Sequence, residues 1–160
     1  MLDELDSNIL SLLREDGRMA INTIAKKLDT RRATIHARYS KMISNGIIKG
    51  FTVVPNWKKL GYSITVFILV SILRQTPIKG NFEAHLNREI RKIPFIVEIH
   101  HISGEFDLLL KARVQDLETT GTEIVFKLKK IRGIGRTLTM TTFVSTLEEL
   151  DVQEQIKHLF

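Results

Sequence analysis

A cluster of basic side chains lies near the N-terminus of this 160-residue chain. Residues 26–49 contain seven lysines and arginines and one acid, Asp29, whereas residues 62–160 are nearly balanced in charge. Positive side chains gathered in one segment attract a polyanion, although the same composition also suits a solvated helix face. The members of this basic cluster are Lys26, Lys27, Arg31, Arg32, Arg38, Lys41 and Lys49.

A second group of residues suited to binding is Ser103, Gly104 and Asp107. A glycine turn exposes backbone N–H groups, which suit a carboxylate, and the carboxylate of Asp107 suits an ammonium group. Together these groups match a zwitterionic amino acid. The residue types alone are also consistent with no binding site, in which case Gly104 only forms a turn and Asp107 is only a surface acid.

Other chemistries have little support in the residues. The chain has no cysteine, which excludes disulfides and thiolate metal sites and favours a cytoplasmic protein. His100 and His101 are adjacent on an expected strand, so they point to opposite faces and cannot bind one metal ion together. The longest apolar run, residues 65–73, is far shorter than the roughly 20 residues of a membrane-spanning helix. We therefore expect no catalytic residues, no metal, no cofactor and no contact with a membrane.

Helical periodicity dominates the N-terminal third. Apolar side chains recur at helical spacing from Leu5 to Leu13, from Ile21 to Leu28 and within 31–44, which predicts three short helices. A strand is expected over 47–54. Three helices, the last two joined by a tight turn, followed by a β segment are typical of a winged helix-turn-helix domain. A three-helix module for protein interaction is the alternative.

The third predicted helix has the features of a DNA-recognition helix. If Ile35 points inward, then Ala33, Ala37 and Ser40 point outward, and small outward side chains let a helix approach the floor of a major groove. Arg38 lies near the buried stripe, where a structural ion pair explains it as well as a DNA contact does. The expected DNA-binding residues are Arg31, Arg32, Thr34, His36, Lys41 and Lys49.

Strands and helices alternate after Pro55. The order βαββαβ predicts a ferredoxin-like fold of the α+β class, with both helices on one face of a four-stranded antiparallel sheet. The expected elements are strands over 64–73, 95–102, 106–114 and 136–145, a helix with the stripe Phe82, Leu86, Ile90 and Ile93, and a helix capped by Asp116 with the stripe Leu117, Ile124, Val125, Leu128 and Ile131.

These patterns divide the chain into parts. We expect a DNA-binding domain over residues 1–54, a linker over 55–63 and the ferredoxin-like domain over 64–146. The acidic tail 147–160 has no functional interpretation. In the first strand of the second domain both sets of alternating side chains are apolar, although the helices can cover only one face. The simplest cover for the other face is a second copy of the chain.

Several motifs together resemble the Lrp/AsnC family of transcription regulators, also called feast/famine regulatory proteins, over roughly residues 2–146. The hairpin 103–110 resembles the family's Gly-x-x-Asp hairpin, and residues 132–139 resemble its Pro-Gly-Val-x-Arg-Thr-x-Thr signature, with Arg132 in place of proline. The opening helix, the segment from Arg38 to Phe51 and the linker Leu60-Gly61-Tyr62 also match. The family usually has a serine cap where this chain has Arg31, so Thr30 or Asp29 would have to cap the recognition helix.

This resemblance implies a regulator that binds double-stranded DNA and responds to a small effector, usually an amino acid. It implies a homodimer that assembles further, into a tetramer or octamer, through an ACT-like (RAM) ligand-binding domain. In the family the Gly-x-x-Asp hairpin lies at an effector site between dimers. Carried over to this chain, the effector-binding residues are Ser103, Gly104, Asp107, Thr139 and Thr141.

Two other functions stay open. An architectural DNA-wrapping protein without an effector would share the DNA-binding features. A sirohaem-decarboxylase-like enzyme would share the architecture, but we would expect it to lose the basic recognition helix and to carry a His-rich pocket. This chain keeps Arg31, Arg32 and Lys41 and has no such His-rich element after His101.

Overall fold

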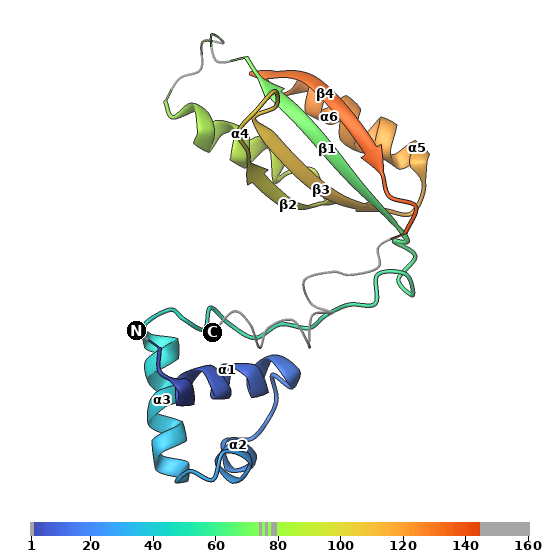
Figure 1. The fold of residues 1–160 in the computed structure, drawn as a ribbon. Helices are drawn as coiled ribbons and strands as arrows, with labels where there is room; N and C mark the ends of the chain where they lie inside the picture. The colour runs from blue at the N-terminus through green and yellow to red at the C-terminus, as the bar shows by residue number, and fades with distance from the viewer. Residues whose placement is uncertain (1, 74, 76, 78–79, 145–160) are drawn as a thin grey trace. The chain divides into compact units, whose positions relative to one another are not determined.

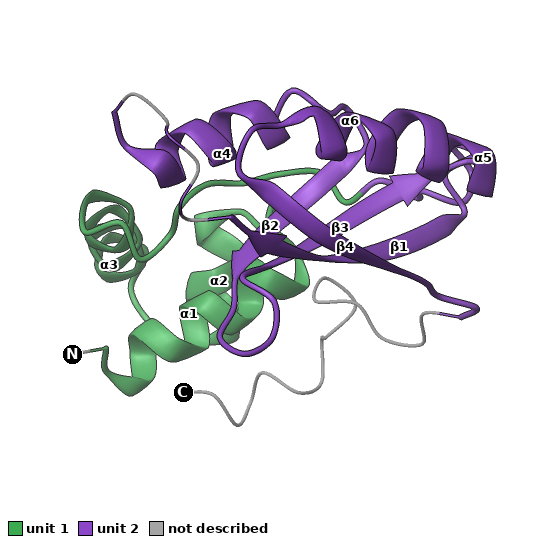
Figure 2. Ribbon diagram, turned by 90° about the horizontal axis from the view of Figure 1, so that it is seen from above, with its two compact units in different colours: residues 1–54, 147–160 green, residues 55–146 purple. Residues whose placement is uncertain are grey.

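The computed structural model of the chain describes residues 2–144, apart from residues 74, 76, 78 and 79 (Figure 1). It divides into two compact units, the first holding residues 1–54 and the second Pro55–Thr146 (Figure 2). The predicted tail 147–160 and the end of the predicted fourth strand lie outside the described residues. In the part of the chain that is described, no helix is long and apolar enough to cross a membrane.

The first unit contains the three predicted helices, α1 (Glu4–Glu15), α2 (Ile21–Lys27) and α3 (Arg32–Ser44). Asp3 begins α1 with a capping box, in which its carboxylate accepts the Asp6 N–H and the Asp6 carboxylate accepts the Asp3 N–H. The apolar stripes of the three helices meet in a small core, as the periodicity predicts. Its buried members are Ile9, Leu13, Ile24, Ala25, Ile35 and Met42.

Arg38 fastens α3 to the start of α1. Its guanidinium pairs with the carboxylate of Asp3 and lies 3.2 Å from that of Asp6. Asp6 is only 8% exposed, so the guanidinium compensates an acid that is largely withdrawn from water. The structural ion pair is therefore the correct interpretation of Arg38.

The start of α3 differs from the prediction. Arg31 occupies the N-cap position, and no side chain caps the helix there. The hydroxyl of Thr30 donates to the carbonyl of Leu28 instead, and Asp29 turns the chain with a φ of 45°. The expected cap by Thr30 or Asp29 is wrong because both residues form the tight turn between α2 and α3.

The predicted strand over 47–54 is also absent from the single chain, where these residues form no ladder. Ile48 is half-buried against the core of the first unit, but the other apolar side chains of the segment are exposed, and Val53 reaches 80%. A strand requires hydrogen bonds to a neighbouring strand, and no segment of the described chain supplies them. The β propensity of the segment is therefore unmet within one copy, and the strand predicted over 47–54 is wrong for the single chain.

The second unit has the predicted βαββαβ order. Its strands are β1 (Ile64–Ile72), β2 (Ile96–His101), β3 (Leu108–Val114) and β4 (Ile134–Thr141), in the antiparallel order β2-β3-β1-β4. Helix α4 (Phe82–Ile90) follows β1, and a continuous helical segment follows β3. That segment comprises α5 (Leu117–Thr119), the π-helical turn η1 (Thr120–Val125) and α6 (Phe126–Lys130), and Asp116 caps it as predicted.

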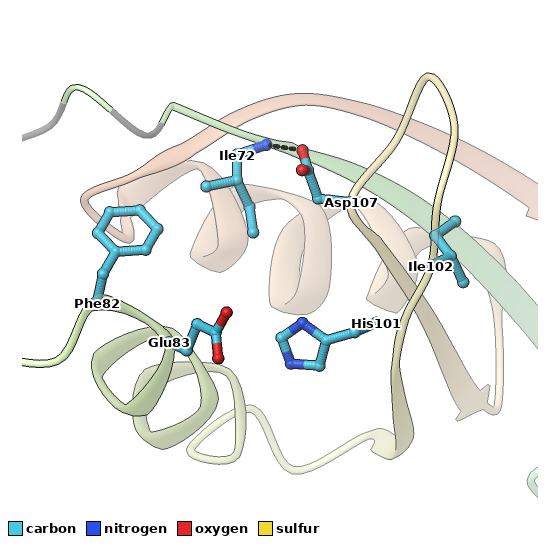
Figure 3. A pocket seen from close by; sticks show the side chains of 6 residues that line it. All are labelled: Ile72, Phe82, Glu83, His101, Ile102 and Asp107. Atoms are coloured by element: carbon cyan, nitrogen blue, oxygen red, sulfur yellow. Dashed lines mark hydrogen bonds between the residues drawn. The ribbon is translucent and has the colours of Figure 1, made fainter.

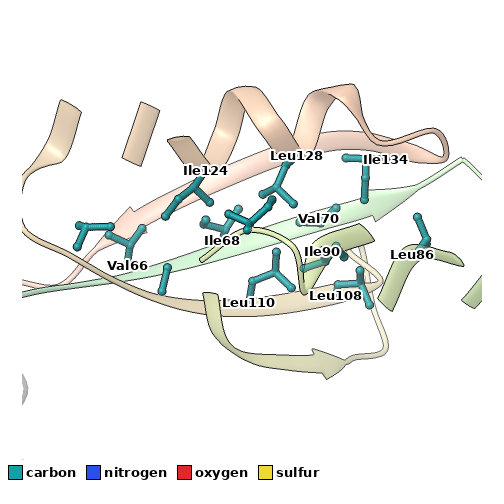
Figure 4. Close-up of a cluster of buried hydrophobic side chains, with 13 residues drawn as sticks. Val66, Ile68, Val70, Leu86, Ile90, Leu108, Leu110, Ile124, Leu128 and Ile134 are labelled. Carbon is teal, nitrogen blue, oxygen red and sulfur yellow. The ribbon is translucent and has the colours of Figure 1, made fainter. Parts of the chain in front are cut away.

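Strand β1 forms the centre of the sheet and of the core. One set of its side chains, Val66, Ile68 and Val70, is fully buried under the helices (Figure 4). Each buried aliphatic side chain of this size stabilises a fold by about 1.5–3 kcal/mol. The other buried members from the helices and neighbouring strands are Leu86, Ile90, Ile93, Leu108, Leu110, Ala112, Val114, Ile124, Leu128 and Ile134.

On the opposite face of the sheet, the described residues of the second unit place no helix (Figure 1). Leu69 lies between Leu109 of β3 and Leu138 of β4, and Phe67 lies beside Met140 of β4. Leu138 is 48% exposed and Met140 44%. This open apolar face, formed by Phe67, Leu69, Leu109, Leu138 and Met140, is the surface for which the sequence predicts a cover.

Acid should weaken the first unit through Asp3. The pKa of Asp3 is below its ordinary value of 3.8 because its carboxylate accepts the Asp6 backbone N–H and then because it bonds Arg38. A carboxylate whose pKa is lowered by folding stabilises the fold above its ordinary pKa and loses that effect as it is protonated. We expect the urea midpoint of α-helical unfolding to drop between about pH 6 and about pH 3, and the drop to be smaller in Asp3→Asn.

The matched control is Glu15→Gln, at the exposed end of α1. This variant should keep the acid sensitivity of the unchanged protein. An Asp3→Asn protein with undiminished acid sensitivity would contradict the role of this ion pair.

Candidate functional site

Helix α3 presents small and basic side chains on its outer face. Ala33, Ala37 and Ser40 are exposed, as the helix wheel predicts, while Ile35 and Met42 are buried on the opposite side. A helix with small outward side chains can lie close to the floor of a groove, with longer residues at its flanks reaching phosphates or base edges.

The predicted DNA-binding residues are all exposed. Among the described residues, Arg31, Arg32, Lys41 and Lys49 have no acidic partner within ion-pair distance, in contrast to Arg38. Their charges are therefore available to an external anion. Thr34 and His36 are exposed on α3 beside them, whereas Lys49 lies in the segment that forms no strand in the single chain.

The hairpin between β2 and β3 is attached to the end of β1. Gly104 has a φ of +130°, a conformation that favours glycine, and its side-chain position faces open space. The Asp107 N–H donates to the carbonyl of Val70 at 2.9 Å. The Asp107 carboxylate accepts the N–H of Ile72 at 2.7 Å. Asp107 is thus neither an isolated surface acid nor an unoccupied ammonium site, because it holds the backbone of β1.

The first residues of β4 complete this corner. Ser71 Oγ accepts the backbone N–H of Arg136 at 2.7 Å, at the point where the ladder between β1 and β4 shifts register. The guanidinium of Arg136 lies over the ring of Phe106 and pairs with Glu105 of the hairpin. A Cβ at Gly135 would lie 2.7 Å from Ser71 Oγ and 3.2 Å from the Ser71 carbonyl oxygen, so a larger residue there would require Ser71 to shift.

A small pocket lies at this corner. Its volume is about 240 Å³, below the roughly 300–1,000 Å³ of sites for drug-sized ligands, so it suits a molecule the size of one amino acid. Figure 3 shows the side chains from β1, α4, β2 and the hairpin that converge on it. The lining residues are Ile72, Phe82, Glu83, His101, Ile102 and Asp107.

The structure brings only part of the expected effector site together. Asp107 lines the pocket, and Ser103 and Gly104 lie exposed in the same hairpin. Thr139 and Thr141 lie on β4, across β1 from the hairpin, and Thr141 pairs with Val66, four residues and about 13 Å along the strand from Val70. Within one chain these threonines are therefore not neighbours of the hairpin, and they could join such a site only through another copy.

Sequence reasoning missed Phe82, Glu83 and His101 as pocket residues. The predicted topology could have identified them. In a ferredoxin-like sheet the ends of β1 and β2 and the beginning of α4 meet at one edge, so residues at these positions are neighbours. Separately, a search of the described residues finds no group of three His, Asp or Glu side chains that could hold a metal ion.

Two family models match the chain. The model of the AsnC-type helix-turn-helix domain matches residues 2–43, and that of the Lrp/AsnC ligand binding domain matches residues 65–151. The first match covers α1 to α3, and the second covers the sheet, its helices and the pocket.

Related sequences agree with these matches. An uncharacterized HTH-type transcriptional regulator of Pyrococcus horikoshii is 40% identical over 150 residues, covering 94% of this chain and 98% of the relative. The HTH-type transcriptional regulator FL11 of Pyrococcus furiosus is 31% identical over 140 residues, covering 88% of each.

Solved structures show the same fold. A transcriptional regulator of Neisseria meningitidis in complex with L-methionine aligns over 100% of both chains with a TM-score of 0.85 and 20% identity. AsnC of E. coli aligns over 92% of this chain and 96% of its own, with a TM-score of 0.77 and 23% identity.

Removing the Asp107 carboxylate should destabilise the second unit. In Asp107→Ala the Ile72 N–H loses a charged acceptor, and such bonds contribute about 1.5–3 kcal/mol. We expect the free energy of unfolding, measured by urea titration, to fall by about that amount. Asp107→Asn, which keeps an acceptor oxygen, should lose less. If Asp107→Ala and the unchanged protein had equal free energies of unfolding, the bond between Asp107 and Ile72 would not stabilise the fold.

Proposed function

The chain belongs to the Lrp/AsnC family of transcriptional regulators, and we propose that it is a cytoplasmic, sequence-specific DNA-binding protein whose activity responds to an amino acid or a close relative. It combines a DNA-binding helix-turn-helix with an Lrp/AsnC ligand-binding domain. The observation that carries the proposal is the outer face of α3, where exposed basic residues that have no acidic partner in the described part of the chain flank small side chains.

DNA would be read by α3 in the major groove. Arg31 and Arg32 stand at the start of this helix, the part of a recognition helix that enters the groove, while Lys41 lies near its end. Thr34 and His36 can reach base edges, and Lys49 can reach the phosphate backbone. A dimer would place two such helices in grooves about one turn apart, or a multiple of that distance, on a pseudo-palindrome.

The open apolar face supports a homodimer. Phe67, Leu69 and Leu138 lie on a sheet face without a helix, and a second copy would cover it with the same residues in a symmetric contact. Exposed residues 47–54 offer a further β segment for pairing between copies. Assembly into tetramers or octamers is the extension that the family suggests.

The corner pocket is the proposed effector site. The match to the ligand-binding domain model covers all of its lining residues, and a structural neighbour of this chain was solved with L-methionine. Ser103 and Gly104 would lie at its mouth, and Thr139 and Thr141 of another copy would complete it. Effector binding would then alter assembly, and through it how many α3 helices bind DNA together.

An architectural DNA-binding protein is the second candidate, since the exposed basic face of α3 supports it equally. DNA binding that no amino acid alters would favour it. The enzyme alternative has less support, because the related sequences are named as transcriptional regulators and α3 keeps its basic residues.

Replacement of Arg31 and Arg32 by alanine should weaken DNA binding strongly. If each head of a dimer neutralises about three or four phosphates, log K falls against log[salt] with a slope of roughly −5 to −7, and each lost contact reduces the steepness by about 0.9. We expect a weaker affinity and a shallower slope for the double variant in fluorescence-anisotropy titrations across salt concentrations.

The matched control removes two charges elsewhere, in Arg91→Ala with Lys129→Ala, both exposed in the second unit. It should bind DNA almost as the unchanged protein does. If the Arg31/Arg32 variant kept the affinity and slope of the unchanged protein, α3 would not be the recognition helix.

A charge on the open apolar face should break the dimer without unfolding the chain. Leu69→Asp and Leu138→Asp place a carboxylate where a second copy would bury it unpaired, which is costly. Light scattering at micromolar concentration should give a dimer or larger for the unchanged protein and the mass of one chain for each variant. Val66→Asp is the contrast, because Val66 is buried under the helices and its replacement should unfold the domain. An unchanged chain that is monomeric would contradict the interface.

A further inference from the structure

We propose that Trp57 and Arg113 fix residues 56–62 to the second unit as a folded turn, and that this attachment limits the spacing between the two DNA half-sites that a dimer accepts. The inference rests on the proposed function, because it assumes a dimer with two DNA-binding units. It concerns a different part of the chain, since neither the recognition helix nor the corner pocket contains these residues.

The predicted linker contains a closed turn, residues 56–62. Asn56 begins it, and the side-chain oxygen of Asn56 accepts the N–H of Lys59 at 3.0 Å. At the other end the N–H of Tyr62 donates to the carbonyl of Trp57 at 2.9 Å. These bonds satisfy backbone groups within the segment itself, so the turn keeps its shape without a neighbouring strand or helix.

Gly61 gives the turn the geometry of a helix end. Its φ is +88°, which favours glycine, and its N–H donates to the carbonyl of Lys58 at 3.1 Å. Together with the bond from Tyr62 to Trp57, this bond completes the Schellman motif. A contact between the side chains at its two ends often accompanies the motif, and here the rings of Trp57 and Tyr62 meet edge to face, with centroids 6.2 Å apart.

Arg113 of β3 attaches the turn to the sheet. Its guanidinium lies over the ring of Trp57, 5.4 Å from the centroid, which is a cation–π contact. The same guanidinium donates at 3.4 Å to the hydroxyl of Thr65, the residue of β1 that Arg113 faces across the two strands. Trp57 is half-buried although it lies in a connecting segment. The turn accordingly belongs to the second compact unit, which begins at Pro55.

The tether that connects the two units is therefore short. Phe51 stacks on Tyr39 of α3, with ring centroids 6.3 Å apart, so the chain contacts the first unit up to this residue. Residues 52–55 lie between that contact and the turn, and four residues span at most about 14 Å. The seven residues of the turn advance about 10 Å in helical geometry and about 24 Å when extended, so opening the turn would double the reach of the tether.

This reach matters for DNA because a dimer binds two half-sites at once. The half-sites lie about one helical turn apart, or a multiple of that, and the separation of the two recognition helices must match them. A further 14 Å of reach, as estimated above, corresponds to about four base pairs for each DNA-binding unit. A closed turn thus restricts the spacings that a dimer accepts, and Trp57 and Arg113 are specificity-determining residues without touching DNA themselves.

Fluorescence tests the attachment, since Trp57 is the only tryptophan of the chain. We expect Arg113→Gln, which removes the cation from the ring, to increase the quenching of Trp57 by acrylamide, a neutral quencher that does not respond to the lost charge. Lys130→Gln is the matched control, because it removes a cation 4.0 Å from the centroid of the Phe126 ring, elsewhere in the second unit. It should be quenched as the unchanged protein is. Equal quenching of Arg113→Gln and the unchanged protein would show that Arg113 does not fix the turn.

Selection of DNA tests the consequence. The full chain and each variant select sites from a pool of random duplexes, and sequencing gives the half-site and the spacing between half-sites. We expect one narrow spacing for the unchanged protein, for Lys130→Gln and for Trp57→Phe, which keeps an aromatic ring. Trp57→Ala and Arg113→Gln should recover the same half-site, with spacings that spread over about four base pairs or more.

The outcomes separate this inference from the proposed function. If acrylamide quenching shows an open turn in Arg113→Gln but the spacing stays narrow, the turn does not limit the spacing, and the proposed function stands. If Trp57→Ala or Arg113→Gln is monomeric in light scattering or recovers no sites, these residues act on assembly or on binding itself, and the inference is wrong. If the unchanged protein recovers no paired half-sites, the proposed dimer on a pseudo-palindrome fails, and this inference fails with it.

Discussion

Strand β1 carries apolar side chains on both of its faces, and the organisation of the second unit follows from the need to shield both from water. Val66, Ile68 and Val70 are covered by α4 and by the segment from α5 to α6, which completes the core of one chain. No helix of the second unit covers Phe67 and Leu69 among the residues that the structure describes. A two-faced central strand therefore specifies a folded domain and, in the same residues, a surface that favours assembly. The end of this strand, at Ser71 and Ile72, is then held by Asp107 and Arg136, and the pocket forms beside it.

In the first unit the same residue type serves two purposes, and the position of nearby acids decides between them. Arg38 pairs with Asp3 and Asp6 and fixes α3 against α1, whereas Arg31 and Arg32 stand at the free end of α3 without an acidic partner among the described residues. The rigid attachment of α3 and its exposed charge are thus complementary requirements of a recognition helix. The number of basic residues in 26–49 does not show which of them pair with an acid. Arg38 is distinguished by its contacts with Asp3 and Asp6, which lie more than thirty residues earlier in the sequence.

Local signals predicted most of the fold correctly. Apolar periodicity located the helices and strands, and side-chain chemistry located the cap at Asp116 and the glycine turn at Gly104. The missed cap of α3 is local, because Thr30 and Asp29 form the turn that precedes the helix. The other failures depend on partners distant in the chain. Residues 47–54 have strand-forming side chains but no strand to pair with, and Asp107 bonds a backbone group 35 residues away. The pocket residue Glu83 lies on a helix that reaches the hairpin only through the topology, so its type and spacing alone carried no signal.

Each of the two units has a buried cluster of its own. The corner pocket is built on the cluster of the second unit, and α3 on the cluster of the first. Residues 103–105 at the tip of the hairpin are exposed, so another copy of the chain can contact them. A ligand that stabilises one arrangement of copies would change how many α3 helices are presented together without deforming any of them. On the proposed function, control through assembly therefore needs no rearrangement inside either unit.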